Sequence, residues 1–448
     1  MQSWLRSALA RKASASEVVK SMDLSQPRGI RDIEPEEFDL HLKIRRAFEE
    51  VARSFNFRLM EPGPLESLSI LRAKSGTQVD DQIYAFKDKA DRDIGLRFDL
   101  TVGMTRNVSS KKGLKPPIKL ASYGGVWRYD EPQHARFRWF YQWDVEIYGD
   151  QSVEADAEVM DLSYNLFKKV GLQDFSLEVG DRRVVEQYLK QSMPNSSEEK
   201  LMEMMRALDK VQKKTEAELA EEYAHKGISR EALAELLKFG RTRGSPDQVC
   251  TRLEEQGLDS AEDGGLFALR DSLRSRSIQN VEYNLSIVRG LDYYTGIVFE
   301  VVDRKHPDLG SLCGGGRYDV LPKLFGRPDL PATGAAGGVE RIALSMGKGA
   351  GAADVESSVY VAYTEPGLAE RALVTVSSLR SAGIRSEVGA RGKSLGKQME
   401  DASSRGFAWV VIIGKRELET GELVLRNMRN RAEEKVPVDV LLARLARV

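Results

Sequence analysis

The stretch that decides the fold is Val126–Glu146, which reads VWRYDEPQHARFRWFYQWDVE. Residues 120–127 and 139–148 are rich in aromatic and β-branched side chains, a composition typical of strands. Between them lies Tyr129–Arg138, which is polar and carries arginine. The sequence therefore predicts a β-hairpin with a long polar tip.

One face of the second predicted strand is largely polar. Because successive side chains of a strand point to opposite faces, four residues share this face: Phe140, Gln142, Asp144 and Glu146. The pattern fits either the wall of a pocket that binds a polar ligand or a solvated amphipathic hairpin. Arg128, at the end of the first strand, would project over the same face, and its guanidinium suits a carboxylate or a phosphate.

A second cluster of polar and aromatic side chains occurs in Val288–Gly296, VRGLDYYTG. It joins two predicted strands, 281–288 and 297–302, and its glycines permit close approach of the backbone to a ligand. Tyrosine in a pocket supplies both an apolar wall and a hydroxyl. A hairpin turn with aromatic packing is the alternative.

Two further segments are rich in glycine. In Leu312–Asp319, LCGGGRYD, the three glycines could cradle a phosphate or make a turn. In Gly334–Ile342, GAAGGVERI, small residues allow a strand and a helix to pack tightly. Arg341 would then lie one turn into the helix, where it either reaches a ligand lying on the strands or is an ordinary surface arginine.

The composition is that of an ordinary globular protein. The chain has 448 residues, of which 41% are hydrophobic and 30% charged, and its net charge is −1. At roughly 100–200 residues per domain, this length suggests two to four domains and excludes a small disulfide scaffold. No apolar run is long enough to span a membrane, and two cysteines and four scattered histidines offer neither a disulfide framework nor metal-ligand spacing. We therefore expect a cytoplasmic protein.

Shifts in composition divide the chain. Residues 181–275 are dominated by Met, Leu, Glu and Lys with helical periodicity, which predicts a helical insertion. Gly347–Ala353, GKGAGAA, has the composition of a flexible linker, and the alternating strands and helices beyond it indicate a small α/β domain with a largely parallel sheet. The expected parts are an N-terminal segment, a main domain in two pieces, the insertion and a last domain: 1–26, 27–180 with 276–348, 181–275, and 355–448.

Several segments, in order along the chain, resemble the class II aminoacyl-tRNA synthetases, and within them the histidyl-tRNA synthetase family. The helix predicted near residues 37–55, with the strand after it, resembles motif 1 of the class. Trp127–Glu146 resembles motif 2, and Gly337–Ile342 resembles motif 3. Arg289–Gly296 resembles a signature of the histidyl enzymes, and Gln26–Asp32 resembles the family's N-terminal opening.

This resemblance implies a pocket for histidine and ATP. Histidine would contact these side chains: Asp99, Thr101, Arg128, Gln142, Glu146, Arg289, Tyr293 and Tyr294. ATP would contact an overlapping set: Arg128, Asp130, Glu131, Arg136 and Arg341. Arg128 and Arg289 would be catalytic because both contact the α-phosphate, and Arg341 would bind the γ-phosphate. Mg²⁺ would arrive with ATP, and we assign no metal to protein side chains.

The resemblance also implies the fold and the reaction. The expected fold is α+β: an antiparallel sheet flanked by helices, a helical insertion and a C-terminal α/β anticodon-binding domain. The expected enzyme is a ligase that activates L-histidine with ATP to histidyl-adenylate and transfers histidine to the 3′ end of tRNA(His). A cytoplasmic homodimer that does not bind membranes is implied as well.

Asp99 and Asp130 stand where bacterial members more often have glutamate, which resembles the archaeal and eukaryotic branch. From Glu356 onward the chain has 15 basic and 12 acidic residues, a mild basic excess. Three arginines beside the last predicted strand could track phosphates or form a solvated face: Arg426, Arg429 and Arg431.

Two other functions remain open at this point. The first is a catalytically silent, synthetase-like regulatory subunit of histidine biosynthesis, but such proteins typically lack the C-terminal domain and lose the motif arginines. The second is a class II synthetase for another amino acid, which Tyr293, Tyr294 and Glu146 argue against.

Overall fold

The computed structural model describes residues 23–73, 80–131, 137–210, 214–258, 264–288, 293–347, 358–390 and 392–445. The chain forms two compact units, Met1–Gly347 and Lys348–Val448, and each is described by itself. Within the described ranges, no helix is long and apolar enough to cross a membrane.

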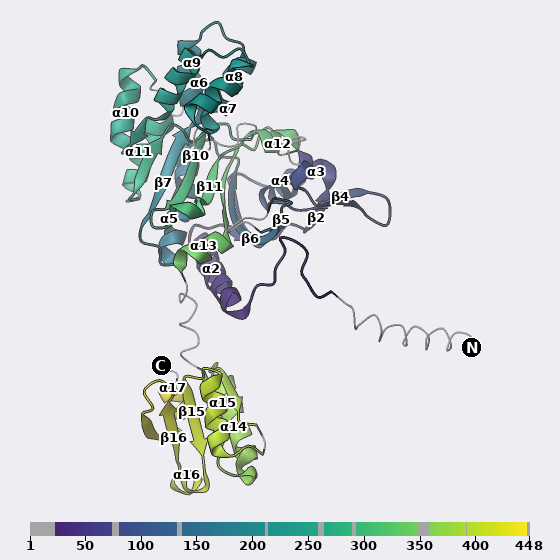
Figure 1. Ribbon diagram of the computed structural model, residues 1–448, viewed down its shortest axis with the longest axis vertical. Coiled ribbons are helices and arrows are strands. Elements are labelled where there is room, and N and C mark those ends of the chain that lie inside the picture. Colours follow the sequence, from purple (N-terminus) through teal and green to yellow (C-terminus); the bar gives the residue numbers. More distant parts are fainter. Residues whose placement is uncertain are drawn as a thin grey trace, which may run out of the picture. The chain divides into compact units, whose positions relative to one another are not determined.

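The first unit is built on a nine-stranded, mainly antiparallel sheet (Figure 1). In spatial order its strands are β1 (Arg58–Leu59), β5 (Ile118–Trp127), β6 (Trp139–Tyr148), β12 (Ala332–Gly338), β11 (Ser311–Arg317), β10 (Ile297–Asp303), β7 (Phe175–Asp181), β9 (Val281–Asn284) and β8 (Arg243–Gly244). Among the described pairs, β1–β5 and β7–β9 are parallel and the others antiparallel. The sheet thus brings the hairpin strands beside both glycine-rich segments.

The predicted hairpin is confirmed. β5 and β6 pair in antiparallel register from Ile118 opposite Tyr148 to Trp127 opposite Trp139. β6 has the predicted bounds, and β5 begins two residues before the predicted strand. The alternating aromatic pattern was sufficient here because both strands pair locally.

Helices cover one face of this sheet, namely α2 (Pro35–Ser54), α5 (Val153–Lys169) and α13 (Val339–Met346). The buried Trp143 of β6 points toward them, because its ring centroid lies 5.7 Å from that of Phe48 on α2 and 6.3 Å from that of Phe167 on α5. Strand alternation then turns Gln142 and Glu146 to the opposite face. The helix layer therefore fixes which side of the sheet is polar.

A smaller, three-stranded sheet lies beside the polar face of the large sheet. Its strands are in the order β2 (Leu65–Ser67), β4 (Asp93–Leu96) and β3 (Ala85–Lys87). Short helices accompany it: α3 (Leu68–Arg72), α4 (Thr101–Ser109) and α12 (Val320–Leu324). Helix α4 was not expected from the sequence. Asp99 Oδ1 accepts a hydrogen bond from the Val102 backbone N–H at 3.1 Å in its first turn, which stabilises the start of this helix.

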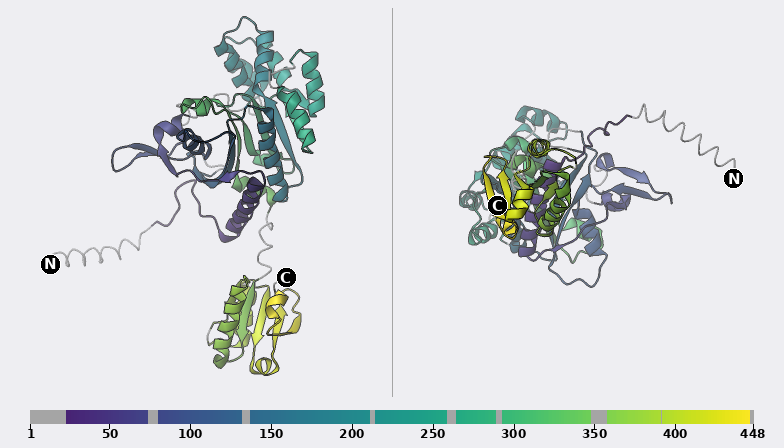
Figure 2. Two further views of the ribbon diagram at one scale, coloured as in Figure 1. Left: turned by 180° about the vertical axis from the view of Figure 1, so that it is seen from behind. Right: turned by 90° about the horizontal axis from the view of Figure 1, so that it is seen from below.

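The chain between β7 and β9 is mainly helical, as the composition predicted. Its helices are α6 (Arg182–Ser192), α7 (Glu198–Asp209), α8 (Glu216–Ala224), α9 (Arg230–Gly240), α10 (Pro246–Glu255) and α11 (Gly265–Ser275). Helices α6 to α9 gather beyond one end of the large sheet, whereas α10 lies beside α11 and contacts the outer strands β8 and β9 (Figures 1 and 2). Four of these helices begin at a serine or threonine whose side chain accepts a backbone N–H, which defines their starts: Ser197, Thr215, Ser229 and Ser245.

The second unit is a five-stranded sheet with its strands in the order β14 (Ser386–Val388), β13 (Val359–Tyr363), β15 (Trp409–Ile413), β16 (Glu422–Asn427) and β17 (Glu433–Pro437). Its helices are α14 (Ala369–Ser381), α15 (Leu395–Ser404), α16 (Lys415–Thr420) and α17 (Leu441–Leu445). The predicted α/β character is confirmed, but the largely parallel sheet was wrong, because β15, β16 and β17 pair antiparallel. The connections after β15 and β16 span residues 414–421 and 428–432, and the first holds only the short helix α16. Both are shorter than the dozen or more residues that a crossover between parallel strands needs.

Two further expectations were wrong. Gly314–Gly316 form neither a turn nor a phosphate loop, because they lie within β11 between β10 and β12. A Cβ at Gly315 would lie 2.5 Å from the Gly334 carbonyl oxygen, so glycine permits close packing there. The strands that flank residues 289–296 do not form a hairpin, because β7 lies between β9 and β10.

Of the expected linker Gly347–Ala353, residues 348–353 lie outside the described residues, as do residues 1–22 of the N-terminal segment.

Candidate active site

A cavity of about 550 Å³ lies over the polar face of the large sheet. Its walls come from β6, β10, β11, β12, α13, the segments that follow β4, β5 and β11, and the segments that precede β3 and β10. Nine of the side chains selected from the sequence line it: Asp99, Thr101, Arg128, Asp130, Gln142, Glu146, Tyr293, Tyr294 and Arg341. Residues more than 200 positions apart in the chain therefore meet in one site.

The polar row of β6 is hydrogen-bonded to the start of α4. The Thr101 hydroxyl donates to Asp144 Oδ2 at 2.9 Å, and the Gln142 amide donates to the same oxygen at 3.4 Å. Asp144 is fully buried and is not among the residues that line the cavity. It acts as an anchor that holds Thr101 and Gln142 in the wall.

Glu146 lies among tyrosines. The Tyr318 hydroxyl donates to Glu146 Oε2, and the ring of Tyr318 stacks on that of Tyr293 with centroids 4.8 Å apart. Tyr294 meets Tyr293 edge to face at 4.9 Å. Burial, and then the Glu146 carboxylate, raise the pKa of Tyr318 well above its usual value, so its hydroxyl remains a donor. Tyr318 was not selected from the sequence, although it lies within the glycine-rich segment Leu312–Asp319.

The backbone opposite Glu146 must be glycine. A Cβ at Gly334 would lie only 1.7 Å from Glu146 Oε2, far inside any contact distance. β12 pairs with β6 so that Gly334 faces Glu146 directly. The small residues of β12 thus leave the space that this carboxylate occupies.

Arg128 follows β5 and reaches across the cavity. Its Nε donates to the Phe98 carbonyl oxygen at 2.9 Å, and its Nη2 donates to Gln142 Oε1 at 3.3 Å. Its guanidinium carbon lies 5.2 Å from the ring centroid of Phe140. These contacts hold a cationic, multidentate donor next to the polar row.

Arg341 and Glu340 form the first turn of α13 at another part of the wall. Arg341 Nη1 donates to the Ser311 carbonyl oxygen at 2.8 Å, which draws its guanidinium toward β11. Glu340 Oε1 accepts the Tyr141 backbone N–H at 2.9 Å and so extends the ladder between β6 and β12 past the end of β12. Burial raises the pKa of Glu340 to about 7.

The remaining selected residues are placed differently. Glu131 pairs with Arg28 at 3.0 Å on an exposed surface, whereas Asp130 lines the cavity. Arg136 and Arg289 lie outside the described residues. Of the three guanidinium groups expected around one triphosphate, Arg128 and Arg341 thus line the same cavity, and the position of Arg289 stays a prediction.

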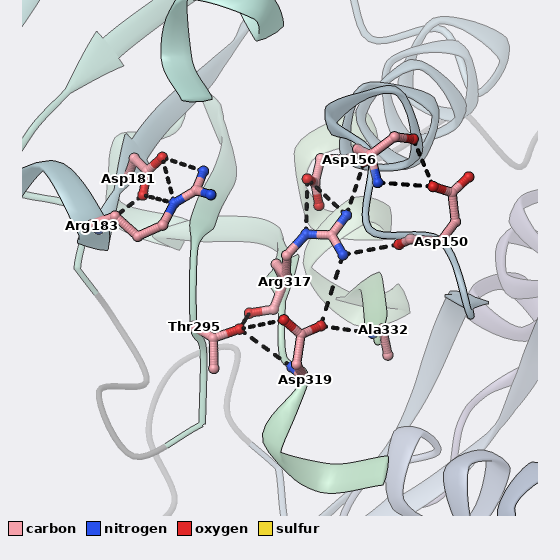
Figure 3. A network of polar contacts seen from close by, with 9 residues as sticks. Asp150, Asp156, Asp181, Arg183, Thr295, Arg317, Asp319 and Ala332 are labelled. Atoms are coloured by element: carbon pink, nitrogen blue, oxygen red, sulfur yellow. Dashed lines mark hydrogen bonds and ion pairs between the residues drawn. The ribbon is translucent and has the colours of Figure 1, made fainter. Parts of the chain in front are cut away.

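A buried polar network supports the wall from behind (Figure 3). Arg317, at the end of β11, donates from Nε and Nη2 to Asp156 Oδ2 on α5 at 3.1 and 3.0 Å. Its backbone carbonyl accepts the Thr295 N–H at 2.8 Å, and Thr295 directly follows Tyr293 and Tyr294. Arg317 thereby connects β11, helix α5 and the segment that carries Tyr293 and Tyr294.

Gln82, Phe137 and Glu300 are among the other lining residues that were not singled out from the sequence. Glu300 is the one carboxylate in the otherwise apolar run Ile297–Val302, a signal that a strand analysis could have used. Phe137 lay within the quoted loop but carried no polar group to draw attention.

No group of three His, Cys, Asp or Glu residues in the described parts of the chain could hold a metal ion. The cavity instead has arginine guanidinium groups, which donate hydrogen bonds, and carboxylates, which accept them. This set fits a magnesium ion carried by nucleotide phosphates and does not fit a metal held in a cage of protein ligands.

The mainly antiparallel sheet carries one polar cavity, which is lined by the long hairpin and by a glycine-rich strand followed by the helix that bears Arg341. This arrangement defines the catalytic domain of a class II aminoacyl-tRNA synthetase. The family model described as histidyl-tRNA synthetase matches residues 29–342, and one described as an anticodon binding domain matches residues 358–447. The chain belongs to the histidyl-tRNA synthetase family.

Relatives with the curated name histidine–tRNA ligase match almost end to end. The protein of Thermococcus kodakarensis is 33% identical, with 92% of this chain and 96% of that protein covered. The protein of Pyrobaculum islandicum is 34% identical over the same shares. The crystal structure of histidyl-tRNA synthetase from Nostoc has a TM-score of 0.83 at 26% identity and covers 95% of this chain and 100% of its own.

A structure described as an ATP phosphoribosyltransferase regulatory subunit/histidyl-tRNA synthetase from Bacillus halodurans C has a TM-score of 0.72 at 24% identity, covering 88% of this chain and 99% of its own. That likeness shows a shared fold only. The named relatives, which extend through the anticodon-binding domain, do not favour a regulatory subunit.

Proposed function

We propose that this chain activates L-histidine with ATP and transfers the histidine to the 3′ end of tRNA(His). The observation that carries the proposal is one cavity lined by two kinds of charged group. The Glu146 carboxylate lies there among tyrosines, and Arg128 and Arg341 supply cationic donors to the same cavity. An amino acid with a basic ring and a polyanionic nucleotide need this pairing of charges.

Histidine would lie against Glu146, Asp99 and the two tyrosines. A carboxylate only accepts hydrogen bonds, so it suits the ammonium group or an imidazole N–H. Gln142 and Thr101, both anchored by Asp144, add polar contacts of fixed direction. A pocket built to satisfy a ring N–H rejects apolar amino acids of similar size, because they would leave its polar groups unpaired.

ATP would lie toward the arginines. Arg128 would bridge the histidine carboxylate and the α-phosphate, and Arg341 would contact the γ-phosphate. Asp130, Glu131 and Arg136 would lie near the triphosphate and the adenine, and Arg289 would reach the α-phosphate from the side opposite Arg128. Magnesium bound to the nucleotide would supply further positive charge on the phosphates.

The first step needs no nucleophilic side chain. The histidine carboxylate oxygen attacks the α-phosphorus, its new P–O bond forms, and the bond to the leaving pyrophosphate breaks. Two anions must approach, so fixed guanidinium groups aid the reaction by positioning and by stabilising the charge of the transition state. The second step passes histidine from the adenylate to the terminal ribose hydroxyl of the tRNA.

The second unit would bind the anticodon of this tRNA. Of its three clustered arginines, Arg426 pairs with Glu433 at 2.8 Å, which leaves it less suited to a phosphate. We also propose that the chain acts as a homodimer in the cytoplasm, as the resemblance of its N-terminal helix to motif 1 implies.

Amino-acid-dependent ATP–pyrophosphate exchange, run with each of the twenty amino acids, tests the proposal. We expect exchange with histidine alone. The absence of exchange with every amino acid would identify the chain as the silent regulatory subunit. The variant Arg289→Ala should lose about 2–4 kcal/mol of transition-state stabilisation, comparable to the loss of an oxyanion donor. Near-wild-type exchange in that variant would refute the role of Arg289.

A further inference from the structure

The helical insertion, which has no part in the proposed function, contacts the tyrosine-bearing wall of the cavity through Arg182. This arginine is the first residue of α6, directly after β7. Its Nη1 donates to the Tyr294 carbonyl oxygen at 3.0 Å, and its backbone N–H donates to the Gly296 carbonyl oxygen at 3.2 Å. The start of the insertion is therefore hydrogen-bonded to the backbone on both sides of Thr295.

The guanidinium of Arg182 is oriented by the insertion itself. Its Nε donates to Glu186 Oε1, one turn along α6, at 2.9 Å, and its Nη2 donates to Met202 Sδ on α7 at 3.2 Å. The side chain is largely buried. Because a guanidinium is planar and its donors point in fixed directions, contacts on Nε and Nη2 determine where Nη1 points. Helix α7 thus helps to set the position of the donor that holds the Tyr294 carbonyl oxygen.

The segment Tyr293–Gly296 is supported from β11 as well. The Thr295 backbone N–H donates to the Arg317 carbonyl oxygen at 2.8 Å, and its hydroxyl donates to Asp319 Oδ2 at 3.3 Å (Figure 3). The segment is therefore held by the end of β11 and by the start of the insertion. Loss of the Arg182 contact removes one of these two supports.

The tyrosine rings connect this segment to the carboxylate of the cavity. Tyr294 meets Tyr293 edge to face, and Tyr293 stacks on Tyr318. The Tyr318 hydroxyl donates to Glu146. A displacement of the Tyr294 backbone would therefore disturb a row of packed rings that ends at Glu146.

The two arginines of the cavity are held by other elements. Arg128 donates to the Phe98 carbonyl oxygen and to Gln142, and Arg341 donates to the Ser311 carbonyl oxygen. These hydrogen bonds do not involve the tyrosine-bearing segment. A displacement of that segment should thus weaken the binding of a ligand beside the tyrosines more than the binding of a ligand beside the arginines.

We propose that Arg182 is a positioning residue for histidine and that it couples the helical insertion to the tyrosines of the cavity. The insertion orients the guanidinium, the guanidinium holds the Tyr294 carbonyl oxygen, and the tyrosine rings keep their places beside Glu146. This inference rests on the proposed function, because it takes histidine as the ligand beside the tyrosines.

The first test compares Arg182→Ala with Arg276→Ala in the full-length chain. Arg276 is the control because it also joins two helices, and its acidic partners, Glu154 at 2.8 Å and Asp161 at 3.5 Å, do not line the cavity. In calorimetric titrations, Arg182→Ala should bind histidine about tenfold more weakly, the usual loss for a hydrogen bond from a charged donor, and ATP within about twofold of wild type. Arg276→Ala should leave both affinities unchanged.

The conservative variant Arg182→Lys keeps the test decisive if Arg182→Ala unfolds. Its ammonium group can still donate to one carbonyl oxygen but cannot make the other contacts of the guanidinium. Histidine binding should therefore weaken less than in the alanine variant, with ATP binding again unchanged. Unchanged histidine affinity in both variants, or equal losses for histidine and ATP, would overturn the positioning role.

The second test acts on Arg182 from the insertion. Met202→Lys places an ammonium group beside the guanidinium, and the repulsion between the two cations should weaken histidine binding by about fivefold. Met202→Leu keeps the volume without adding charge and is the control. In an Arg182→Ala background, Met202→Lys should have no further effect, because the group that it displaces is gone.

Two results of the second test would overturn the coupling to the insertion. They are equal histidine affinities for Met202→Lys and Met202→Leu, and additive losses for Met202→Lys and Arg182→Ala. A wild-type protein that binds histidine without histidine-dependent exchange would refute the proposed function and leave the role of Arg182 intact.

Discussion

At the scale of single residues, the site depends on groups that hold others in place. Glu146 would be the reader of the histidine side chain, yet its position is set by the Tyr318 hydroxyl on one side and the missing side chain of Gly334 on the other. A carboxylate is useful for recognition only if its direction is fixed before the ligand arrives. The residues that fix this direction, Tyr318 and Gly334, carry no charge.

The substitution Gly334→Ala should therefore impair catalysis through Glu146. Its Cβ would overlap the carboxylate, and the adjustment should cost about 1–3 kcal/mol of stability and displace Glu146. We expect histidine-dependent exchange to fall at least about tenfold while the protein stays folded. Gly113 does not line the cavity, and a Cβ there would meet nothing within 4 Å, so Gly113→Ala is the control. An unchanged KM for histidine in Gly334→Ala would contradict this account.

Glu340 should make the stability depend on pH. Burial raises its pKa from 4.5 to about 7, so between these values the folded chain holds a proton that the unfolded chain has lost. The contribution of this residue to stability therefore falls as the pH rises through that window, by an amount on the order of 3 kcal/mol, and is constant above it. Chemical denaturation of wild type and Glu340→Gln at about pH 5 and about pH 8 should show the smaller pH dependence in the variant. Parallel pH dependence of the two proteins would exclude this role.

Much of the site could be predicted at this scale, because its polar residues stand in segments with unusual patterns. Gln142 and Glu146 follow from strand alternation, and Arg128 and Arg341 from their places at the ends of elements. Tyr318 could not be predicted, because an ordinary aromatic residue acquires a role only through the partner that the fold brings to it.

At the scale of elements, β11 is held by contacts beyond its own ladder. Arg317 at its end binds Asp156 on α5 and, through its side chain, the carbonyl oxygens of Asp150 and Ser152 that precede this helix (Figure 3). Burial raises the pKa of Asp156 to about 6, and the charge of Arg317 opposes that shift. The pair thus fixes α5 against the strand that precedes Tyr318.

Removing one partner of this pair should lower the free energy of unfolding more than removing both. Arg317→Met leaves a buried carboxylate without its cation, which should cost roughly 3–5 kcal/mol in the free energy of unfolding. The double variant Arg317→Met with Asp156→Leu should recover part of that loss. Urea denaturation of both single variants and the double variant measures the coupling. A double variant less stable than either single variant would show that the pair does not behave as a buried ion pair.

The sequence predicted elements best where pairing is local. The β5–β6 hairpin and the helical character of 181–275 follow from patterns within short windows. β11 was misjudged because glycines usually mark turns, and only its neighbours β10 and β12 explain why they are needed in a strand. The mixed sheet of the second unit was also missed, because strand direction is decided by the connections between strands rather than by composition.

At the scale of the whole molecule, two units would divide the labour. The cavity lies in the first unit, within the match to the histidyl-tRNA synthetase family, and the second unit matches the anticodon binding domain. Each has its own buried core, and that of the second unit includes Val361, Val411 and Leu425. Adenylate formation should therefore not require the second unit, whereas charging of the tRNA should.

A chain truncated at Gly351 tests this division. We expect histidine-dependent exchange to remain within about threefold of the full chain, because the described part of the cavity wall comes from the first unit alone. Transfer of histidine to tRNA(His) should fall by about a hundredfold or more, because anticodon contacts contribute several kcal/mol to binding. Equal losses in both assays would mean that the two units do not act independently.

The most direct test of the central claim is a crystal structure of the protein with histidine and a non-hydrolysable ATP analogue. We expect the imidazole to lie beside Glu146 and Tyr293, and the phosphates to lie between Arg128 and Arg341. Phosphates bound elsewhere, or an imidazole turned away from Glu146, would refute this binding mode.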